Sequence, residues 1–228
     1  LQSSLALSKR KYQQEMIYSL MSEIYLTLDE YEKAGDTAKK AHRLDSSDVK
    51  ALITLGDLSY KNQNYKQALK YYKSASAHDK TAYKPIVNEA KTYQKLNELE
   101  KAEDLYKKVL KTHSDSYEAY YNVAMMQDEN SQDRIVYLKK AIAVNLQYKE
   151  AWLELAKIEI SRENFDIAQK YLSNAYYIDE NDFRYYYYQG LLYRGLGETT
   201  KAIYNFKKCL KLNPNFTPAE NVLEPTIK

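Results

Sequence analysis

Small and large side chains recur along the chain with a period of 34 residues, shortened once by two residues. Two independent series share these steps. One is Ala34, Ala68, Ala102, Arg134, Ala168 and Ala202, and the other is Ala41, Ala75, Val109, Ala141, Ala175 and Cys209. A shared period with a shared deletion indicates internal repeats.

A third series places a large residue four positions before a small one, which puts both on one face of a helix. The small members are Ser22, Gly56, Ala90, Ala124, Ala156 and Gly190, and the large members are Tyr18, Leu52, Ile86, Tyr120, Trp152 and Tyr186. A small residue lets a neighbouring helix approach closely, while the large one fills the space beside it. A further large row, Tyr72, Tyr106, Leu138, Leu172 and Phe206, follows the first small series by four positions. The pattern predicts two packed helices in every repeat.

Composition agrees with a helical, folded chain. The 228 residues include only 5 glycines and 4 prolines, with 44% hydrophobic and 29% charged residues. Few helix breakers predict long helices with short turns, and the apolar fraction is too high for a disordered chain. The 34 basic and 31 acidic residues are interspersed, so a nucleic-acid partner is not expected.

The location of the protein is left open by the sequence. No stretch approaches the roughly 20 apolar residues of a membrane helix, so we expect a soluble chain, cytoplasmic or periplasmic. The chain begins at Leu1 and not at a methionine. We therefore expect a fragment whose native N-terminus lies upstream, and we expect membrane contact only through that upstream sequence or through a partner.

Residues typical of catalysis or metal binding lack the spacing that such chemistry needs. Cys209 occupies a small core position without a CxxC partner or an acid–base neighbour, and is interpreted as core. His42, His78 and His113 fall near the ends of successive second helices, where a histidine complements the helix dipole. The glycines of "RGLGETTK" lack the third glycine and the preceding strand of a phosphate loop. We expect no enzyme activity, no metal and no cofactor.

The repeats resemble the tetratricopeptide repeat family, whose unit of 34 residues contains two antiparallel helices. The clearest copy is "ALITLGDLSYKNQNYKQALKYYKSASAHD", which has Leu55 and Gly56 followed by Ala68, Tyr72 and Ala75 at the family's spacing. A later copy, "AWLELAKIEISRENFDIAQKYLSNAYYID", matches nearly as well. The resemblance implies an all-α fold, a right-handed α-α superhelical solenoid.

The period divides the chain into six repeats with short flanking segments. The predicted repeats are 15–48, 49–82, 83–116, 117–148, 149–182 and 183–216. Residues 1–14 are interpreted as the remnant of a preceding repeat's second helix, because Leu7 lies one period before Ala41. Residues 217–228 are interpreted as a short cap helix and tail. Because Arg134 replaces a small residue, 117–148 is expected to pack less regularly.

The family resemblance also implies a concave groove lined by the first helices. The lining residues lie one before and one after the large core position, and then one turn on. Carried over to this chain, the candidate peptide groove contains Asn88, Lys91, Tyr121, Asn122, Met125, Leu153, Glu154, Lys157, Arg184, Tyr187, Tyr188, Leu191 and Arg194. The wider lining adds Ile53, Asp57, Tyr60, Lys84, Val87, Glu118, Glu150 and Ile160. Tyr121, Leu153 and Tyr187 fall at equivalent places and predict one continuous ridge.

The segment "RYYYYQG" places four tyrosines in a row in a chain with 25 tyrosines. Tyr186 is expected in the core, in the position of Trp152 one repeat earlier. Tyr187 and Tyr188 are expected in the groove, and Tyr185 near the repeat boundary.

Apolar and aromatic area with charges at its margins suits an amphipathic helix or an extended segment with apolar anchors. A carboxylate clamp, as in family members that bind a chaperone's carboxyl terminus, is not predicted, because only Lys84, Asn88 and Asn122 fit its pattern. We therefore expect a non-enzymatic adaptor or assembly factor with a protein or peptide partner. The chain itself is expected to be a monomer or to self-associate weakly.

Two alternatives stay open. In the first, the chain is a structural subunit that joins a larger assembly by end-to-end stacking of its solenoid. In the second, paired lysines on the second helices form a stripe that meets anionic lipid or nucleic acid. These pairs are Lys39 and Lys40, Lys107 and Lys108, Lys139 and Lys140, and Lys207 and Lys208.

Overall fold

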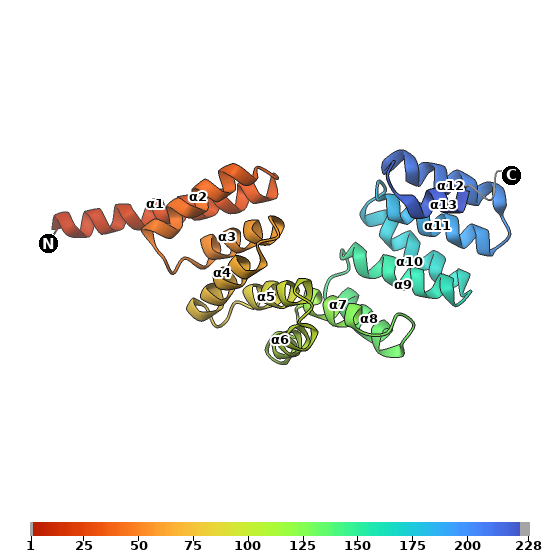
Figure 1. Ribbon diagram of the computed structural model, residues 1–228, viewed down its shortest axis with the longest axis horizontal. Helices are drawn as coiled ribbons and strands as arrows, with labels where there is room; N and C mark the ends of the chain where they lie inside the picture. The colour runs from red at the N-terminus through yellow and green to blue at the C-terminus, as the bar shows by residue number, and fades with distance from the viewer. Residues whose placement is uncertain (1, 224–228) are drawn as a thin grey trace. The chain divides into compact units, whose positions relative to one another are not determined.

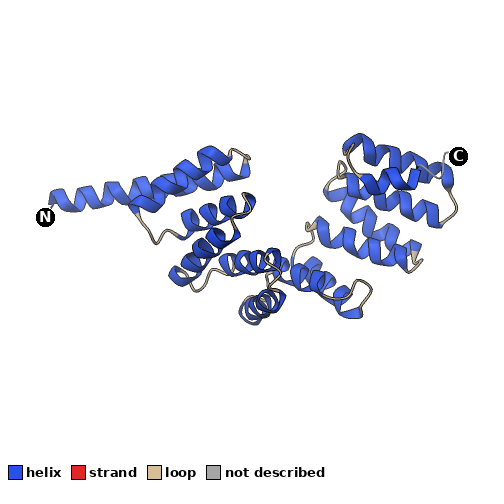
Figure 2. Ribbon diagram, in the orientation of Figure 1, coloured by secondary structure: helices blue, strands red, loops and turns tan. Residues whose placement is uncertain are grey.

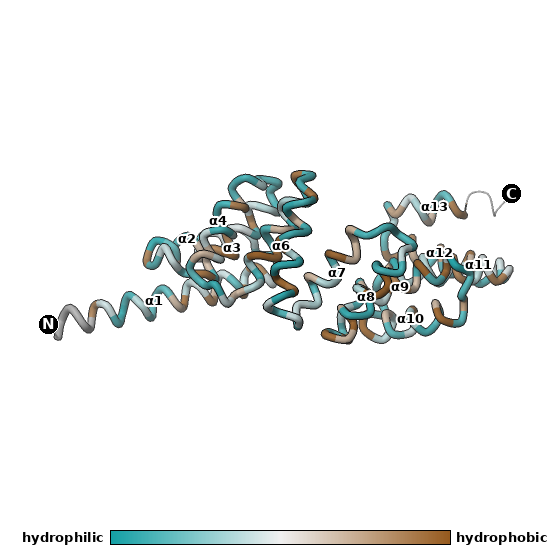
Figure 3. The backbone as a smooth tube through the Cα atoms, turned by 90° about the horizontal axis from the view of Figure 1, so that it is seen from below, coloured by the Kyte–Doolittle hydropathy of each residue, from teal (hydrophilic) through white to brown (hydrophobic). Residues whose placement is uncertain are grey.

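The computed structural model describes residues 2–223, which form thirteen helices and no strand (Figures 1 and 2). The helices belong to two compact units, Leu1–Ser114 and Asp115–Lys228, named unit 1 and unit 2 below. None of the described helices combines the length and the apolar character needed to cross a membrane. Polar and apolar residues alternate along the helices (Figure 3), as amphipathic packing requires.

Each unit is a succession of antiparallel helix pairs. Unit 1 contains α1 (Gln2–Thr27), α2 (Tyr31–Leu44), α3 (Val49–Lys61), α4 (Tyr65–His78), α5 (Lys84–Lys95) and α6 (Leu99–Thr112). Unit 2 contains α7 (Tyr117–Met126), α8 (Gln132–Val144), α9 (Lys149–Ser161), α10 (Phe165–Ile178), α11 (Phe183–Gly195), α12 (Thr199–Leu212) and α13 (Thr217–Leu223). Odd-numbered helices up to α11 are the first helices of their pairs, and even-numbered helices are the second.

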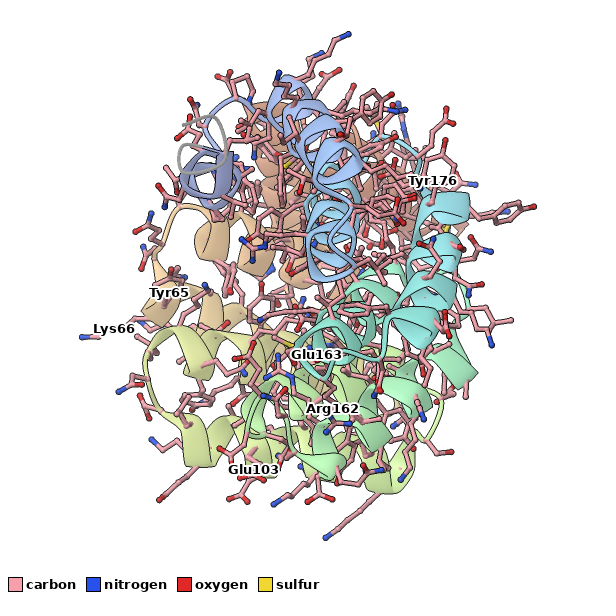
Figure 4. All side chains as sticks on the ribbon, turned by 90° about the vertical axis from the view of Figure 1, so that its right-hand side faces the viewer. Tyr65, Lys66, Glu103, Arg162, Glu163 and Tyr176 are labelled. Carbon is pink, nitrogen blue, oxygen red and sulfur yellow. The ribbon has the colours of Figure 1, made fainter. Side chains whose placement is uncertain are left out.

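The turn inside most pairs contains a residue in the left-handed conformation, at Asp29, Gln63, Asn97, Glu163 and Gly197. The next residue donates its backbone N–H to the carbonyl five positions back, for example from Asn164 to Glu159 at 2.9 Å. This is a Schellman motif, which satisfies carbonyls at the end of the first helix. Arg162 and Glu163 mark one such turn (Figure 4). The α7–α8 turn lacks the left-handed residue, because the repeat is two residues short there.

Except at the α6–α7 junction, where His113 occupies the position, the turn after each second helix is set by an acid or amide side chain that accepts a hydrogen bond from the backbone two residues on. The accepting residues are Asp45, Asp79, Asn145, Asp179 and Asn213, with distances of 2.8–3.3 Å. These Asx turns stop the second helix and allow the next first helix to begin.

The predicted small-to-large packing is confirmed by burial. The small alanines of the first series and the large row on the second helices are at most 3% exposed, among them Ala68, Tyr72, Ala202 and Phe206. A Cβ atom added to Gly56 would overlap the ring of Tyr72, and one added to Gly190 would lie 2.5 Å from the Phe206 ring. The glycines therefore allow the ring of the second helix to lie directly on the backbone of the first.

Arg134 fills the position that is small in the other repeats. Its side chain is buried, and Nη2 donates to Glu154 Oε2 at 3.0 Å while Nη1 donates to the carbonyl oxygen of Gln127 at 3.3 Å. The guanidinium thus reaches from α8 to α9. The departure from the repeat pattern replaces apolar packing with an ion pair.

The interpretation of residues 1–14 as a separate second helix is wrong for the residues that the structure describes. From Gln2 onward they belong to α1, which continues without a break to Thr27, and the predicted core residue Leu7 is 69% exposed. The physical reason is local. Residues 11–14, "KYQQ", stand one period before the turn "DSSD" at 45–48 and contain no Asp, Asn, Ser, Gly or Pro, so no turn-favouring residue interrupts the helix.

The C-terminal helix covers the last helix pair. Ala219 and Leu223 of α13 are buried against Tyr186, Phe206 and Cys209. This is the packing expected of a cap. Residues 224–228 of the predicted tail lie outside the described part of the chain.

A matched pair of glycine substitutions tests this packing. Gly56→Ala should lower the free energy of unfolding by about 1–3 kcal/mol, because the added methyl overlaps the Tyr72 ring. Gly35→Ala meets its nearest neighbour, Leu58 Cδ1, at 3.4 Å, and should stabilise the chain by up to about 1 kcal/mol through helix propensity. Urea denaturation measures both. Equal effects of the two substitutions would show that close helix approach at Gly56 is not needed.

A second test concerns the buried ion pair. Arg134→Met should destabilise the chain by about 1–3 kcal/mol, because Glu154 loses its partner while only partly accessible to water. Adding Glu154→Gln should recover most of the loss, since no uncompensated charge then remains. Thermal and urea denaturation of the two single variants and the double variant form a thermodynamic cycle. Additive losses would mean that the two side chains do not interact.

Candidate functional site

Tyrosines gather on the first helices of unit 2. The rings of Tyr121 on α7 and Tyr148, the residue before α9, are perpendicular with centroids 5.1 Å apart. The ring of Tyr117 also packs against Tyr148, with centroids 4.8 Å apart. Perpendicular and tilted ring pairs of this kind hold one another in place. The three rings are half-buried, so each presents part of its surface to solvent.

A second aromatic group lies on α11, in the four-tyrosine segment. Tyr187 packs against Tyr188 at 5.5 Å and against Phe216 at 5.1 Å. Tyr186 is buried as predicted, and its hydroxyl donates to the carbonyl oxygen of Glu180 at 2.7 Å. Tyr185 contacts Tyr176 of the preceding helix. One segment therefore supplies both core and partly accessible rings.

The hydroxyls of these rings stay protonated at neutral pH. Burial, with a further contribution from the charges of Glu154 and Glu150, raises the pKa of Tyr121 to about 12. Burial also raises the pKa values of Tyr148 and Tyr188. A neutral phenol can donate a hydrogen bond as well as accept one. This side of unit 2, formed by the first helices, thus offers apolar ring surface together with tyrosine hydroxyls that can donate hydrogen bonds.

Charged side chains between the rings are held by ion pairs. Arg184 donates to Asp182 at 2.6 Å and to Glu150 at 3.3 Å, so it ties the start of α11 to α9. Burial opposes ionisation of Asp182, but hydrogen bonds from Arg184 and Lys149 hold its pKa at about 2. Glu154 is fixed by Arg134. The charges on this side of unit 2 are therefore oriented by contacts within the chain.

The other predicted groove residues of unit 2 differ in what their side chains contact. Asn122 donates to the Glu118 carbonyl oxygen of its own helix at 2.7 Å, and Met125 Sδ accepts from Arg134 Nη2 at 3.3 Å. Lys157 forms an ion pair with Glu129. Leu191 is half-buried among the aromatic residues around Phe206, and Arg194 is exposed.

Leu153 was predicted to be an accessible groove residue, and this prediction is wrong. It is 2% exposed and packs with Ala156, Leu172 and Leu192. Its side chain fills the contact between successive helix pairs, where α11 covers it. The continuous ridge predicted from Tyr121 through Leu153 to Tyr187 is therefore interrupted. Tyr148 supplies the ring beside Tyr121 instead.

In unit 1 the predicted residues Asn88 and Lys91 line a cavity of about 240 Å³ together with Asp57, Tyr60 and Tyr72. Asp57 Oδ1 accepts hydrogen bonds from the Tyr72 hydroxyl at 2.7 Å and from Asn88 Nδ2 at 2.9 Å. The cavity has room for one side chain of a partner.

Two further residues of the wider predicted lining in unit 1 do not line this cavity. Val87 is fully buried, which corrects its assignment to the groove surface. Lys84 is exposed at the start of α5.

Sequence reasoning missed three contributors to the face of unit 2. Tyr148 and Phe216 lie two periods apart, and each directly precedes a helix. Their shared place in the repeat could have identified both rings from the sequence. Arg134 was visible only as a departure from the small-residue series. Its partner Glu154 could not be identified without the fold.

The lysine stripe has a structural role in three repeats. The ammonium groups of Lys40, Lys140 and Lys208 lie over the rings of Tyr18, Tyr120 and Tyr186, at 4.2–5.7 Å from the centroids. These tyrosines occupy the large core position of their repeats. The lysines therefore cover the outer faces of core rings through cation–π contacts.

The described residues contain no group of three or more His, Cys, Asp or Glu side chains arranged to hold a metal ion. Cys209 is buried, and burial raises the pKa of its thiol to about 11. A thiol in that state is a poor nucleophile at neutral pH.

Comparison with known proteins supports the repeat assignment. Models of the tetratricopeptide repeat match residues 59–124 and 183–216. A DnaJ homolog subfamily C member 7 homolog of Schizosaccharomyces pombe is 26% identical over 197 residues, which cover 76% of this chain and 41% of the relative. The chain thus spans less than half the length of that relative.

Solved structures share the fold at low sequence identity. The Cut9–Hcn1 hetero-tetramer structure of APC/C has a TM-score of 0.84 at 16% identity, over 99% of this chain and 45% of that one. YrrB, described as a TPR protein with an unusual peptide-binding site, has a TM-score of 0.56 at 18% identity, over 84% of this chain and 100% of that one. Repeat spacing, helix pairing and both family matches agree, and the chain belongs to the tetratricopeptide repeat family.

Proposed function

We propose that the protein is an adaptor or assembly factor that binds a helical or extended segment of a partner protein on the first-helix face of unit 2. The observation that carries this proposal is the packed ring pair of Tyr121 and Tyr148 beside the ion pair of Arg134 and Glu154. Large rings held in fixed positions lose little freedom on binding and supply much of the energy of such interfaces.

The geometry favours a partner with apolar anchors and a polar backbone. The accessible parts of the rings offer apolar contact, and their neutral hydroxyls can bond to peptide groups. The acidic side chains Glu150 and Glu154 are already paired with arginines. A partner that needed a free charge on this face would have to break an existing ion pair, which is costly in a partly buried place.

The comparisons support protein interaction in general and not a particular partner. Tetratricopeptide repeat proteins are protein-interaction modules, and YrrB is described as having a peptide-binding site. The cavity of about 240 Å³ in unit 1 is a second place for a side chain of a partner segment.

Peptides selected from a displayed random library against the whole chain test this proposal. Tyr121→Ala should weaken binding of a selected peptide at least about tenfold, because a good anchor contributes about 2 kcal/mol or more. Asn122→Arg should weaken it as well, by adding bulk to the face without opening a hole beneath it. Fluorescence anisotropy gives the Kd values, and thermal melting checks that each variant folds.

Tyr177→Ala is the matched control, because Tyr177 on α10 is 87% exposed and lies outside the proposed face. It should bind like the wild type. The charge reversal Lys107→Glu with Lys108→Glu tests the lysine stripe in the same assay. The proposal fails if that reversal abolishes binding while Tyr121→Ala and Asn122→Arg leave it unchanged.

A further inference from the structure

One face of α1 carries a strip of exposed apolar side chains. It consists of Tyr12, Met16, Ile17, Leu20 and Ile24, and Leu28 continues it in the turn directly after the helix; these side chains are 43–65% exposed. Isolated exposed apolar residues are ordinary, but a contiguous strip on one helix marks a contact surface. The strip belongs to unit 1, whereas the face proposed above for a partner segment belongs to unit 2.

The opposite side of α1 is fixed by polar contacts, so the strip cannot turn inward. Ser19 Oγ donates to Asp48 Oδ1 at 3.1 Å, and Ser22 Oγ lies 3.3 Å from Thr54 Oγ1. Lys50 Nζ donates to Glu23 Oε2 at 2.9 Å. These contacts tie α1 to α3 and the turn before it. The rotation of α1 about its axis is therefore set.

Within each unit, the second helix of one pair packs against the first helix of the next, as α2 does on α3, α4 on α5, α8 on α9 and α10 on α11. Residues 2–14 do not fold back to do this for α1. They extend the same helix beyond α2, as Figure 1 shows at the red end of the chain. The segment "KYQQ" at 11–14 contains no turn-favouring residue, which favours a continuous helix. The strip is thus left without a neighbour from residues 2–223.

The charges on either side of the strip differ in sign. Lys9, Arg10 and Lys11 precede it, and all three are exposed. Asp29 and Glu30 follow it, in the turn that ends α1. Asp29 also accepts a hydrogen bond from the Tyr31 hydroxyl, and Glu30 pairs with Lys33. Two such helices in antiparallel orientation place the basic end of each beside the acidic end of the other.

We propose that α1 binds α1 of a second copy of this chain, in antiparallel orientation, around a two-fold axis near Leu20. With this centre, Met16 of one copy lies opposite Ile24 of the other, and Lys11 lies opposite Asp29. The contact is self-complementary, as a two-fold interface must be. It buries the strip and pairs the charges in one arrangement.

A second copy bound end to end is not favoured by this structure. The last helix pair is covered by α13, whose apolar residues Ala219 and Leu223 point inward. Its exposed residues include Glu220 and Asn221, which do not offer an apolar surface to α1. Pairing of α1 with itself needs no such surface.

Cysteine crosslinking gives a direct test in the whole chain. Leu20→Cys should form a disulfide-linked dimer under mild oxidation, because the two-fold axis brings the two side chains together. The native Cys209 is buried and should not contribute. Tyr204→Cys, at an exposed site on α12, is the matched control and should crosslink far more slowly.

Sedimentation measures the interaction without a crosslink. The wild type should form a reversible, concentration-dependent dimer. The variant Leu20→Asp with Ile24→Asp should raise the dimer Kd at least about tenfold, while its thermal melting stays near that of the wild type because both side chains are exposed. The control Tyr177→Asp with Tyr204→Asp should leave the Kd unchanged.

Charge reversal tests the antiparallel register. Lys11→Glu should weaken the dimer and addition of Asp29→Lys should restore it. The turn position of Asp29 carries Gln63 and Glu163 in other repeats, so it tolerates a long side chain.

A wild type that stays monomeric at every concentration overturns the proposal. So does a dimer that survives the aspartate pair on α1, or one that Asp29→Lys fails to restore.

Discussion

The close contact between a small residue of the first helix and a large apolar side chain of the second helix is the constraint on which the rest of the fold depends. At Gly56 and Gly190 the ring of the facing helix occupies the place of a Cβ atom. Such a contact allows only one rotation of each helix about its axis, because any larger side chain at that point would force the pair apart. Once the rotation is fixed, the residues that face outward are fixed as well.

This constraint explains how one tyrosine-rich segment serves two purposes. Tyr186 stands four residues before Gly190 and is therefore directed into the core, where its hydroxyl finds the Glu180 carbonyl. Tyr187 and Tyr188 follow on the next part of the helix surface and stay partly accessible. Lys208 covers the Tyr186 ring from outside. Tyrosine suits both places because it combines a large apolar body with one polar atom.

The fold could be predicted from the sequence because its signal is repeated. Each departure from the period was visible against the other copies, as with Arg134 in the series of alanines. The surface of the candidate site was harder to predict, because exposure depends on helices distant in sequence. Leu153 follows the family's groove spacing, yet α11 covers it, and Tyr148 contributes a ring from a position outside that spacing. The start of the array was misjudged for a local reason, since "KYQQ" at 11–14 contains none of the turn-favouring residues that a separate helix would need.

The central proposal is that the binding face of unit 2 lies on its first helices and not on its second helices. Hydrogen–deuterium exchange of the whole chain, with and without a library-selected peptide, tests this division most directly. The account predicts slower exchange on binding in 117–126, 149–161 and 183–195, with little change in 132–144, 165–178 and 199–212. Protection confined to the second helices would contradict it.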